Sequence, residues 1–535
     1  MKKIMNIISP VLKEYRYRNK PDPFLEFKKL RKNEVLPDED NGNVLLLPIR
    51  MAPISNLFEG IYGYAMKLRG YSVHSLFCNQ AINKCENIHG SKLADIQCSL
   101  CNYEQKRFSN TFGINYHSYF DIIDKKLIKK IKKISQEISL ENIFDFMYDD
   151  VFLGIHIKSA TMRYLLSSSV DKIKDEYLIR EFIFSTIISY ETAKKLILKL
   201  NPKFVLSSHG VYSTWGGALE ACKKLNVHVV IWGRGYVGGN ILASHNESYL
   251  SERVTEPVSY WENIELTDKQ KEKIKNYFLH KRKRDAKIDF VNYYNNIEES
   301  TKSIYELLNL RKDSVKFGLF PNIPWDGTSF SYSNAFPDML IFLKTTINWF
   351  VKHPECDLII RAHPAEMKTG AKESVKDLID SIFLTLPNNV YYLGSDHTIS
   401  SYEVEEISEA SLLYAGTIAL ELANFGKPCI QTGSTNSTNK GFIFEPKSIN
   451  EYENFLEKVS QKELFMTEEM KERAMKFAYH WIYKRHIPEN TYERNGLQFK
   501  KYNLESSMDL ALGKNKFVDF FIDRCEDGKP FIWEE

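Results

Sequence analysis

The chain has 535 residues, a length that exceeds one hydrophobic core and predicts two large domains. Its hydrophobic content of 43% and charged content of 26% are those of an ordinary globular protein, and a net charge of +3 gives no reason to expect a nucleic-acid partner. No apolar run reaches the roughly 20 residues of a membrane span. Pro10 and Lys13 interrupt the short apolar segment near the start, which is unlike a secretory signal.

Eight cysteines in a chain without a secretory signal are typical of a reducing compartment rather than of a disulfide scaffold. We therefore expect a cytoplasmic protein, and peripheral attachment to the inner face of the cell membrane stays open.

The first part of the chain predicts an α/β domain. Residues 1–40 are polar and basic and are expected to form an N-terminal extension. A continuous apolar run at Asn43–Pro48, a helix-like segment at Leu57–Arg69 and a second apolar run at Tyr71–Phe77 then follow. Such β-α-β order favours a doubly wound sheet, whose ligands lie beyond the carboxyl ends of the strands. We place this Rossmann-like domain at residues 41–260.

Four of the eight cysteines fall within a short insertion, at Cys78, Cys85, Cys98 and Cys101. One C-x2-C pair with two further thiols suits a tetrahedral zinc ion or an iron–sulfur cluster. The alternative is four reduced structural thiols. If a metal is present, a structural zinc that pins an irregular loop is the expectation, and His89 or His117 could replace one thiolate.

Two places in this domain could supply a catalytic base. Asp149 and Asp150 lie among aromatic residues and either put a carboxylate in a cleft or cap the following helix. His209 directly follows the predicted strand Phe204–Ser208, at the end where doubly wound folds place their sites.

The second half of the chain predicts another α/β domain. A charged helical connector is expected at residues 261–312. Strands are predicted at Val315–Phe320, Cys356–Arg361 and Val390–Leu393, within a nucleotide-binding domain at 313–465. Residues 466–535 are expected to be C-terminal helices and a tail.

A phosphate-binding turn is predicted within Leu412–Ile430. The apolar run stops at Gly416-Thr417, a helix-like segment Ile418–Phe425 follows, and Gly426 ends it before the next strand. Amides at a helix N-terminus and the helix dipole favour an anionic ligand, and glycine lets a ligand approach the backbone closely.

The predicted strand Cys356–Arg361 ends in Arg361 and is followed by Ala362-His363-Pro364. A guanidinium and an imidazole beside the amides of the glycine turn would bind a phosphate leaving group. Glu421, one turn into the helix, could accept hydrogen bonds from ribose hydroxyls. The alternatives are that Arg361 pairs with Glu366, that His363 caps a helix, and that Glu421 is an exposed helix residue.

These motifs resemble a known group of enzymes. Arg361–Pro364 together with Tyr414–Pro428 resembles GT-B glycosyltransferases, and more narrowly the capsule polysaccharide biosynthesis family, which includes Kdo transferases. CDP-glycerol glycerophosphotransferases share a similar His-Pro element. The loop Pro321–Asp326 also looks like the first loop of the family's second domain. The resemblance covers roughly residues 315–445.

The resemblance implies an α/β fold of two Rossmann-like doubly wound domains that face a central cleft. It implies a glycosyltransferase that moves a sugar from a nucleotide-activated donor to a surface polysaccharide or glycolipid, and it suggests a CMP- or CDP-linked donor. It further implies that Arg361 and His363 contact the donor phosphate, that Gly416 and Thr417 bind the same phosphate, and that Glu421 holds the ribose. No metal or other cofactor is expected to be required for transfer.

An inverting transferase also needs a base to take the proton of the acceptor hydroxyl. Asp149 and His209 are the candidates, whereas a retaining enzyme would need no such base. Two other enzymatic or assembly functions stay open: a non-hydrolysing nucleotide-sugar epimerase of the same fold, and a non-catalytic protein of envelope-polysaccharide assembly. An iron–sulfur redox or sensor protein is a third reading, based on the cysteines.

Overall fold

The computed structural model describes residues 13, 17–31, 36–51, 53–88, 94–283, 303–323, 333, 335–368, 373–496 and 498–534. His89 and residues 324–326 of the predicted first loop lie outside this part of the chain. The chain divides into two compact units. Unit 1 comprises residues Met1–Leu165, Val170–Tyr249 and Arg485–Glu535, and unit 2 comprises Leu166–Ser169 and Leu250–Lys484.

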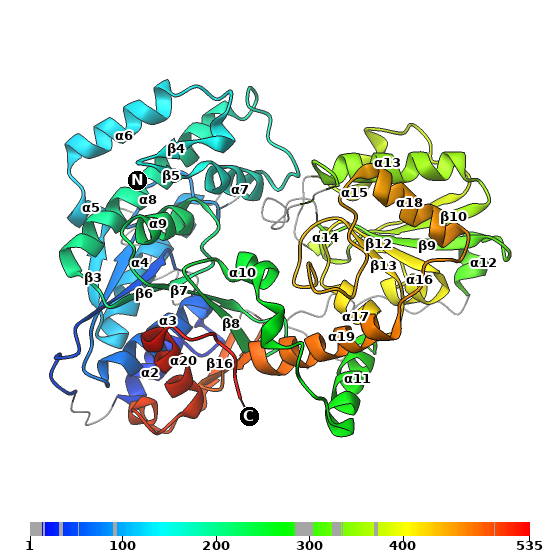
Figure 1. Ribbon diagram of the computed structural model, residues 1–535. Coiled ribbons are helices and arrows are strands. Elements are labelled where there is room, and N and C mark those ends of the chain that lie inside the picture. The colour runs from blue at the N-terminus through cyan, green and yellow to red at the C-terminus, as the bar shows by residue number, and fades with distance from the viewer. Residues whose placement is uncertain are drawn as a thin grey trace. The chain divides into compact units, whose positions relative to one another are not determined.

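Unit 1 is built on a seven-stranded sheet with the order β14-β8-β7-β6-β1-β2-β3 (Figure 1). Its sheet strands are β1 (Asn43–Ile49), β2 (Ser72–Phe77), β3 (Asn115–Ser118), β6 (Phe204–Ser208), β7 (Val229–Arg234), β8 (Asn240–His245) and β14 (Ile487–Pro488). Strands β1, β2, β3, β6 and β7 run parallel. β8 pairs antiparallel with β7, and β14 pairs antiparallel with β8.

Helices cover both faces of this sheet. The main ones are α2 (Pro23–Leu30), α3 (Pro53–Lys67), α4 (Ala94–Phe112), α6 (Lys125–Glu137), α7 (Gly154–Leu165), α8 (Glu176–Leu200), α9 (Ser213–Lys224) and α20 (Lys516–Asp527), with a single turn at α5 (Tyr119–Ile122). Side chains of α3 and α20 pack with β1, β6 and β7 in one core cluster. Helix α9 packs against β1 and β6 and then against α8. Strand β1 is buried along nearly its whole length, as a strand covered on both faces must be.

Both ends of the chain belong to this unit, which differs from the predicted extension and tail. Phe24 and Phe27 of α2 are buried in the unit 1 core, and Phe521 and Ile522 of α20 lie in the same cluster. A small hairpin of β15 (Tyr492–Asn495) and β16 (Gln498–Tyr502) precedes α20. The segment expected to be a tail therefore completes the first domain, because its apolar residues cover the sheet.

Unit 2 contains a five-stranded, wholly parallel sheet with the order β11-β10-β9-β12-β13. The strands are β9 (Val315–Phe320), β10 (Cys356–Arg361), β11 (Val390–Leu393), β12 (Ala410–Leu413) and β13 (Cys429–Gln431). The first three have the predicted bounds. Its helices are α10 (Tyr249–Thr255), α11 (Asp268–Arg282), α12 (Ile304–Leu308), α13 (Met339–Lys352), α14 (Ala365–Lys368), α15 (Val375–Asp380), α16 (Ser401–Ile407), α17 (Ile418–Asn424), α18 (Ile449–Ser460) and α19 (Glu468–Tyr479).

The unit 2 core lies between the sheet and the helices α13, α15 and α18. Helices α16 and α17 lie on the other side of the sheet (Figure 1). Both units are therefore doubly wound α/β domains, and this part of the prediction is confirmed. Among the described residues, no helix is long and apolar enough to cross a membrane.

Candidate functional site

The strand order of each sheet reverses at one place, where crevices for ligands form in open α/β sheets. In unit 2 the reversal lies between β9 and β12, and in unit 1 between β1 and β6. Gly416 and Thr417 follow β12, and His209 follows β6. The strand topology thus puts these three sequence-predicted residues at the carboxyl edge of the sheets, at the two switch points.

The turn at Gly416-Thr417 leads directly into helix α17. Thr417 is the N-cap residue, and its side chain makes no capping hydrogen bond. A Cβ added at Gly416 would lie 3.6 Å from Ile418 Cγ2, which is an ordinary contact. The packing of the protein therefore does not require glycine at this position. A ligand that comes close to the backbone would require it.

The guanidinium of Arg361 contacts backbone carbonyl groups of the protein. Its side chain is 1% exposed, and its guanidinium donates to four backbone carbonyls, those of Ile399 (2.8 Å), Ala362 (2.9 Å), His397 (3.2 Å) and Gly394. These bonds hold the 394–399 loop against the end of β10. Arg361 thus fixes this loop, and its contact with a donor phosphate stays a prediction.

His363 caps the short helix α14, as the alternative prediction states. The backbone amide of Ala365 donates to its Nδ1 (3.1 Å). Burial, together with the charge of Arg361, lowers the pKa of the imidazole to about 4, so the ring is neutral at physiological pH. Because Nδ1 accepts a hydrogen bond, the proton of the neutral ring is on Nε2. The structure therefore makes His363 Nε2 a neutral hydrogen-bond donor next to the Arg361 loop.

Glu421 is buried rather than exposed, which excludes the alternative of a surface helix residue. Its side chain is 1% exposed and its carboxylate lies 3.7 Å from Arg282 Nε and 3.8 Å from Lys281 Nζ. Arg282 also pairs with Glu405 at 2.6 Å and lies over the ring of Phe425. These cations join α11 to α17, so contact between Glu421 and a ribose stays a prediction.

The loop after β13 was assigned no function from the sequence, yet it surrounds a pocket. The pocket has a volume of about 170 Å³, and half of its lining residues have hydroxyl or amide side chains. Gly433 is required here: a Cβ would lie 2.5 Å from the carbonyl oxygen of Tyr414. The only sequence signal was the Ser/Thr/Asn-rich composition of this loop, which is equally typical of ordinary turns.

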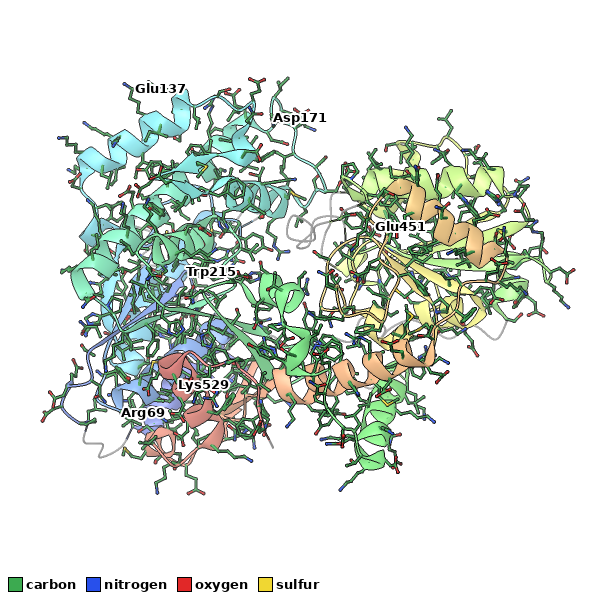
Figure 2. All side chains as sticks on the ribbon, in the orientation of Figure 1. Arg69, Glu137, Asp171, Trp215, Glu451 and Lys529 are labelled. Atoms are coloured by element: carbon green, nitrogen blue, oxygen red, sulfur yellow. The ribbon has the colours of Figure 1, made fainter. Side chains whose placement is uncertain are left out.

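The switch point of unit 1 gathers His209, Arg50 and Trp215. Trp215, which Figure 2 labels, stacks parallel to the His209 ring at a centroid distance of 5.8 Å, and the Arg50 guanidinium lies 4.0 Å from the Trp215 ring. Arg50 Nη1 also lies 3.8 Å from the buried carboxylate of Glu86. Burial and the charges of Arg50, Arg163 and Arg234 lower the pKa of His209 to about 3, so its imidazole is neutral.

No hydrogen bond to the His209 imidazole occurs within the described residues, and its Nδ1 is buried without a partner. His209 also has a positive φ of 65°, a strained conformation that clusters at functional sites. The lone pair of this neutral ring has no competing hydrogen bond, but a pKa of about 3 makes the ring a weak base, since a general base works best when its pKa is close to the working pH. The sequence reasoning that selected His209 missed Arg50 and Trp215.

Asp149 and Asp150 form the two-residue turn of the hairpin β4 (Met147–Tyr148) and β5 (Val151–Phe152), both with positive φ. They do not cap α7. Asp149 accepts hydrogen bonds from Tyr190 Oη (2.5 Å) and from Lys194, both on α8. The bonds from Lys194 and Tyr190 lower the pKa of its carboxyl group. Asp149 thus anchors the hairpin to α8. Asp149 and His209 both stay predictions for the base.

The four cysteines lie partly on a helix rather than in one irregular loop. Cys98 and Cys101 are one turn apart on α4, and the Met51 amide (3.2 Å) and Gln105 Nε2 (3.4 Å) donate to Cys101 Sγ. Burial raises the pKa of Cys78 and Cys101 and raises that of Cys85 to about 12.

Without a metal ion, Cys78, Cys85 and Cys101 are therefore protonated at neutral pH. Binding a metal would displace these protons. In the part of the chain that the structure describes, no three His, Cys, Asp or Glu side chains are grouped as a metal ion would require. The zinc or iron–sulfur site stays a prediction.

No family model and no curated protein matches the chain. Solved structures similar to it include two β-Kdo transferases, both KpsC of Thermosulfurimonas dismutans. The 2,4-transferase is 10% identical, covers 51% of this chain and 79% of its own, and has a TM-score of 0.34. The 2,7-transferase is 11% identical, covers 48% and 74%, and has a TM-score of 0.29.

A UDP-GlcNAc 2-epimerase from Neisseria meningitidis, solved with UDP-GlcNAc, is also similar. It is 11% identical, covers 82% of this chain and 95% of its own, and has a TM-score of 0.25. TM-scores this low carry no argument about activity or substrate. The resemblance to GT-B glycosyltransferases rests on the motifs and on the strand order of the two doubly wound sheets.

Proposed function

We propose that this chain is a glycosyltransferase that moves a sugar from a nucleotide-activated donor to a polysaccharide or glycolipid acceptor. The observation that carries the proposal is the carboxyl edge of the unit 2 sheet. There the glycine turn at the switch point and the His363 imidazole follow strands on either side of β9. Two strand spacings amount to about 10 Å, a distance that a diphosphate or a nucleoside phosphate can bridge.

In this proposal the leaving phosphate receives hydrogen bonds from His363 Nε2 and from the amides at Gly416 and Thr417. A neutral imidazole donor serves this purpose at physiological pH, because the low pKa of His363 keeps one proton on the ring. Arg361 contributes indirectly, since it fixes the 394–399 loop and adds positive potential. Glu421 is proposed to orient the ribose, and a CMP- or CDP-linked donor is the first candidate.

The proposed base for an inverting reaction is His209. Its neutral ring would take the proton of the acceptor hydroxyl as the new C–O bond forms at the anomeric carbon and the bond to the phosphate oxygen breaks. The surrounding arginines would favour an acceptor that carries negative charge, as acidic polysaccharides do. No metal is given a role in transfer, and a zinc ion at the four cysteines would be structural.

Nucleotide binding is the first test. CMP, CDP, UDP, GDP and dTDP are screened by thermal shift, and we expect one of them to stabilise the protein by about 2.7 kcal/mol at a concentration of 100 times Kd. The informative variant is His363→Asn, whose amide oxygen can still accept from Ala365 but which lacks the Nε2 donor. We expect it to fold normally and to lose most of the shift.

His397→Asn is the matched control, because Nδ1 of His397 accepts from the Ile399 amide at 3.1 Å in the same manner. It should bind nucleotide like the wild type. Binding that is unchanged in His363→Asn, or no binding of any of the five nucleotides, would contradict the proposal. Incubating the bound nucleotide's sugar conjugate with the protein alone separates the epimerase alternative, since only an epimerase alters the sugar without an acceptor.

A further inference from the structure

One part of the wall of the pocket beyond β13 consists of uncharged polar side chains. Five of its ten lining residues have a hydroxyl or amide side chain (Gln431, Thr432, Ser434, Thr438 and Asn439), and the other five are Val254, Gly433, Glu445, Pro446 and Lys447. One carboxylate and one ammonium leave this wall without a net charge, so it does not select an anion. Its volume of about 170 Å³ is below the ~300–1,000 Å³ of pockets for drug-sized ligands. A single sugar ring fits this description better than a nucleoside phosphate does.

Two of the lining side chains have hydrogen-bonding atoms that no group of the protein satisfies. Gln431 is 2% exposed and Ser434 is 6% exposed, and neither Gln431 Oε1 nor Ser434 Oγ has a hydrogen-bond partner. Buried polar atoms are nearly always paired, because an unpaired one costs about 1–3 kcal/mol. An unpaired acceptor and an unpaired hydroxyl on one pocket wall therefore indicate a ligand with hydroxyl groups.

The rest of the loop is firmly held, so these two atoms are not unpaired because the loop is loose. Gln431 Nε2 donates to Thr435 Oγ1 (2.9 Å), the Thr435 amide donates to Thr438 Oγ1 (2.8 Å), and the Ser437 amide donates to Thr435 Oγ1 (3.2 Å). At the far wall, the Asn439 amide donates to both oxygens of Glu445, at 3.2 and 3.0 Å. The pocket is thus built before any ligand enters.

The pocket also adjoins the proposed phosphate turn. The Thr432 amide and hydroxyl donate to the carbonyl of Leu413 (3.0 and 3.3 Å), and the Gly433 amide donates to that of Tyr414. Tyr414 is two residues before Gly416. Neighbouring strands lie about 4.8 Å apart, so a sugar joined to a phosphate at Gly416-Thr417 can extend into this space.

From these contacts we propose that the pocket formed by Val254, residues 431–434, residues 438–439 and residues 445–447 binds the sugar of the donor through its hydroxyl groups. Gln431 Oε1 accepts from one sugar hydroxyl, and Ser434 Oγ exchanges a hydrogen bond with a second. This inference rests on the proposed glycosyltransferase function and adds to it the part of the donor that this loop recognises.

The test compares Ser434→Ala with Ser437→Ala in the full-length protein. Both serines are buried in the same loop and both hydroxyls lack a partner, but Ser437 does not line the pocket. Removing an unpaired hydroxyl should not impair folding. Isothermal titration measures Kd for three matched pairs: UDP and UDP-N-acetylglucosamine, GDP and GDP-mannose, CMP and CMP-N-acetylneuraminate.

We expect one conjugate to bind the wild type more tightly than its bare nucleotide does. Ser434→Ala should raise Kd for that conjugate about three- to tenfold and leave Kd for the bare nucleotide unchanged, and Ser437→Ala should change neither. Equal affinities for conjugate and nucleotide in the wild type, or equal effects of the two alanine variants, would overturn the inference while nucleotide binding persists. Absence of all nucleotide binding would instead show that the proposed function itself fails.

Discussion

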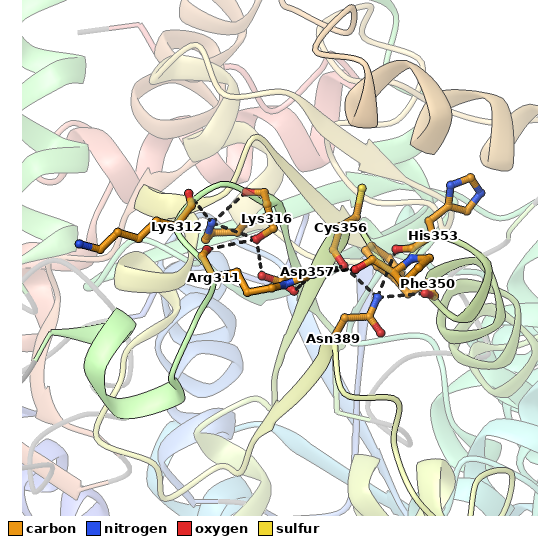
Figure 3. A network of polar contacts seen from close by, with 10 residues as sticks. Arg311, Lys312, Lys316, Phe350, His353, Cys356, Asp357 and Asn389 are labelled. Carbon is orange, nitrogen blue, oxygen red and sulfur yellow. Dashed lines mark hydrogen bonds and ion pairs between the residues drawn. The ribbon is translucent and has the colours of Figure 1, made fainter.

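The two edges of the unit 2 sheet differ in how their polar groups are satisfied. At the amino edge, Asp357 accepts from Arg311 and Ser314, and Lys316 donates to the carbonyls of Ser314 and Lys312 (Figure 3). Asn389 Nδ2 donates to three carbonyls, those of Phe350 (2.9 Å), Cys356 (2.8 Å) and His353 (3.2 Å). The donors and acceptors of this network are matched within the protein.

The carboxyl edges are different. Gln431 Oε1 and Ser434 Oγ in unit 2 and His209 Nδ1 in unit 1 are buried without partners. A matched network stabilises the fold, whereas unmatched groups lower stability unless a ligand completes them. From this contrast we expect substitutions at the amino edge to change stability and substitutions at the carboxyl edges to change binding.

The largest effect is expected at the unit 1 switch point. His209→Ala should lower the transfer rate by about 10²–10⁴-fold, the usual contribution of a general base, with little loss of stability. The control is His228→Ala at the amino end of β7, where His228 Nε2 bonds His245 Nδ1 at 2.8 Å. The transfer rate is measured for both variants. If His209→Ala keeps the wild-type rate, His209 is not the base.

A substitution at the amino edge of the unit 2 sheet should change the stability of the protein and leave nucleotide binding unchanged. Asn389→Ala removes the amide that three buried carbonyls share and should lower the free energy of unfolding by about 3 kcal/mol. Nucleotide affinity of the folded fraction should stay at the wild-type value. Urea unfolding and titration at a temperature where the variant is folded measure the two quantities, and a changed affinity would mean that the edges are coupled.

Acid should weaken the fold through the carboxyl-edge histidines. Burial lowers the pKa of His209 to about 3 and of His363 to about 4, whereas unfolded histidine titrates near about 6.5. Between these values the unfolded chain binds more protons, so stability falls as pH falls from about 6.5 towards 4, by up to about 1.4 kcal/mol per pH unit for each histidine. Urea unfolding at several pH values should show a shallower slope in the double variant His209→Gln/His363→Asn.

The smallest effect on the fold is expected at Gly416. An added methyl group makes only ordinary contacts there, so Gly416→Ala should change the free energy of unfolding by less than about 0.5 kcal/mol. It should nevertheless weaken nucleotide binding about five- to tenfold, or about 1–1.4 kcal/mol, by keeping the phosphate from the backbone. Gly433→Ala, which presses on Tyr414, should unfold more easily. Unchanged nucleotide affinity in Gly416→Ala would argue against a phosphate at this turn.

Most of the two sheets could be predicted from the sequence. The strands Val315–Phe320, Cys356–Arg361 and Phe204–Ser208 are continuous apolar runs bounded by turn residues, and the structure has them at the predicted bounds. A strand buried on both faces needs apolar residues throughout, and a short stretch of sequence is enough to recognise that pattern. Helix α4 was missed because its apolar residues are sparse and the cysteines suggested a loop.

The pairing of the motifs could not be predicted in the same way. Arg361 is a residue type that often binds phosphate, but three of the four carbonyls that it contacts belong to the 394–399 loop, more than 30 residues further along the chain. The sequence around Asp149 is aromatic, and only the fold brings Lys194 and Tyr190 of α8 beside its carboxylate. A side chain's type shows what it can bind, and only its neighbours decide what it does bind.

The sequence by itself determined the class of fold and the glycine turn at Gly416-Thr417, because periodicity, apolar runs and turn residues act over short distances. The tertiary structure decided that residues 485–535 complete the first domain, that Arg50 and Trp215 surround His209, and that a pocket with unpaired atoms lies beside the turn. Burial and hydrogen-bond satisfaction depend on segments far apart in the chain, so no local pattern could reveal them.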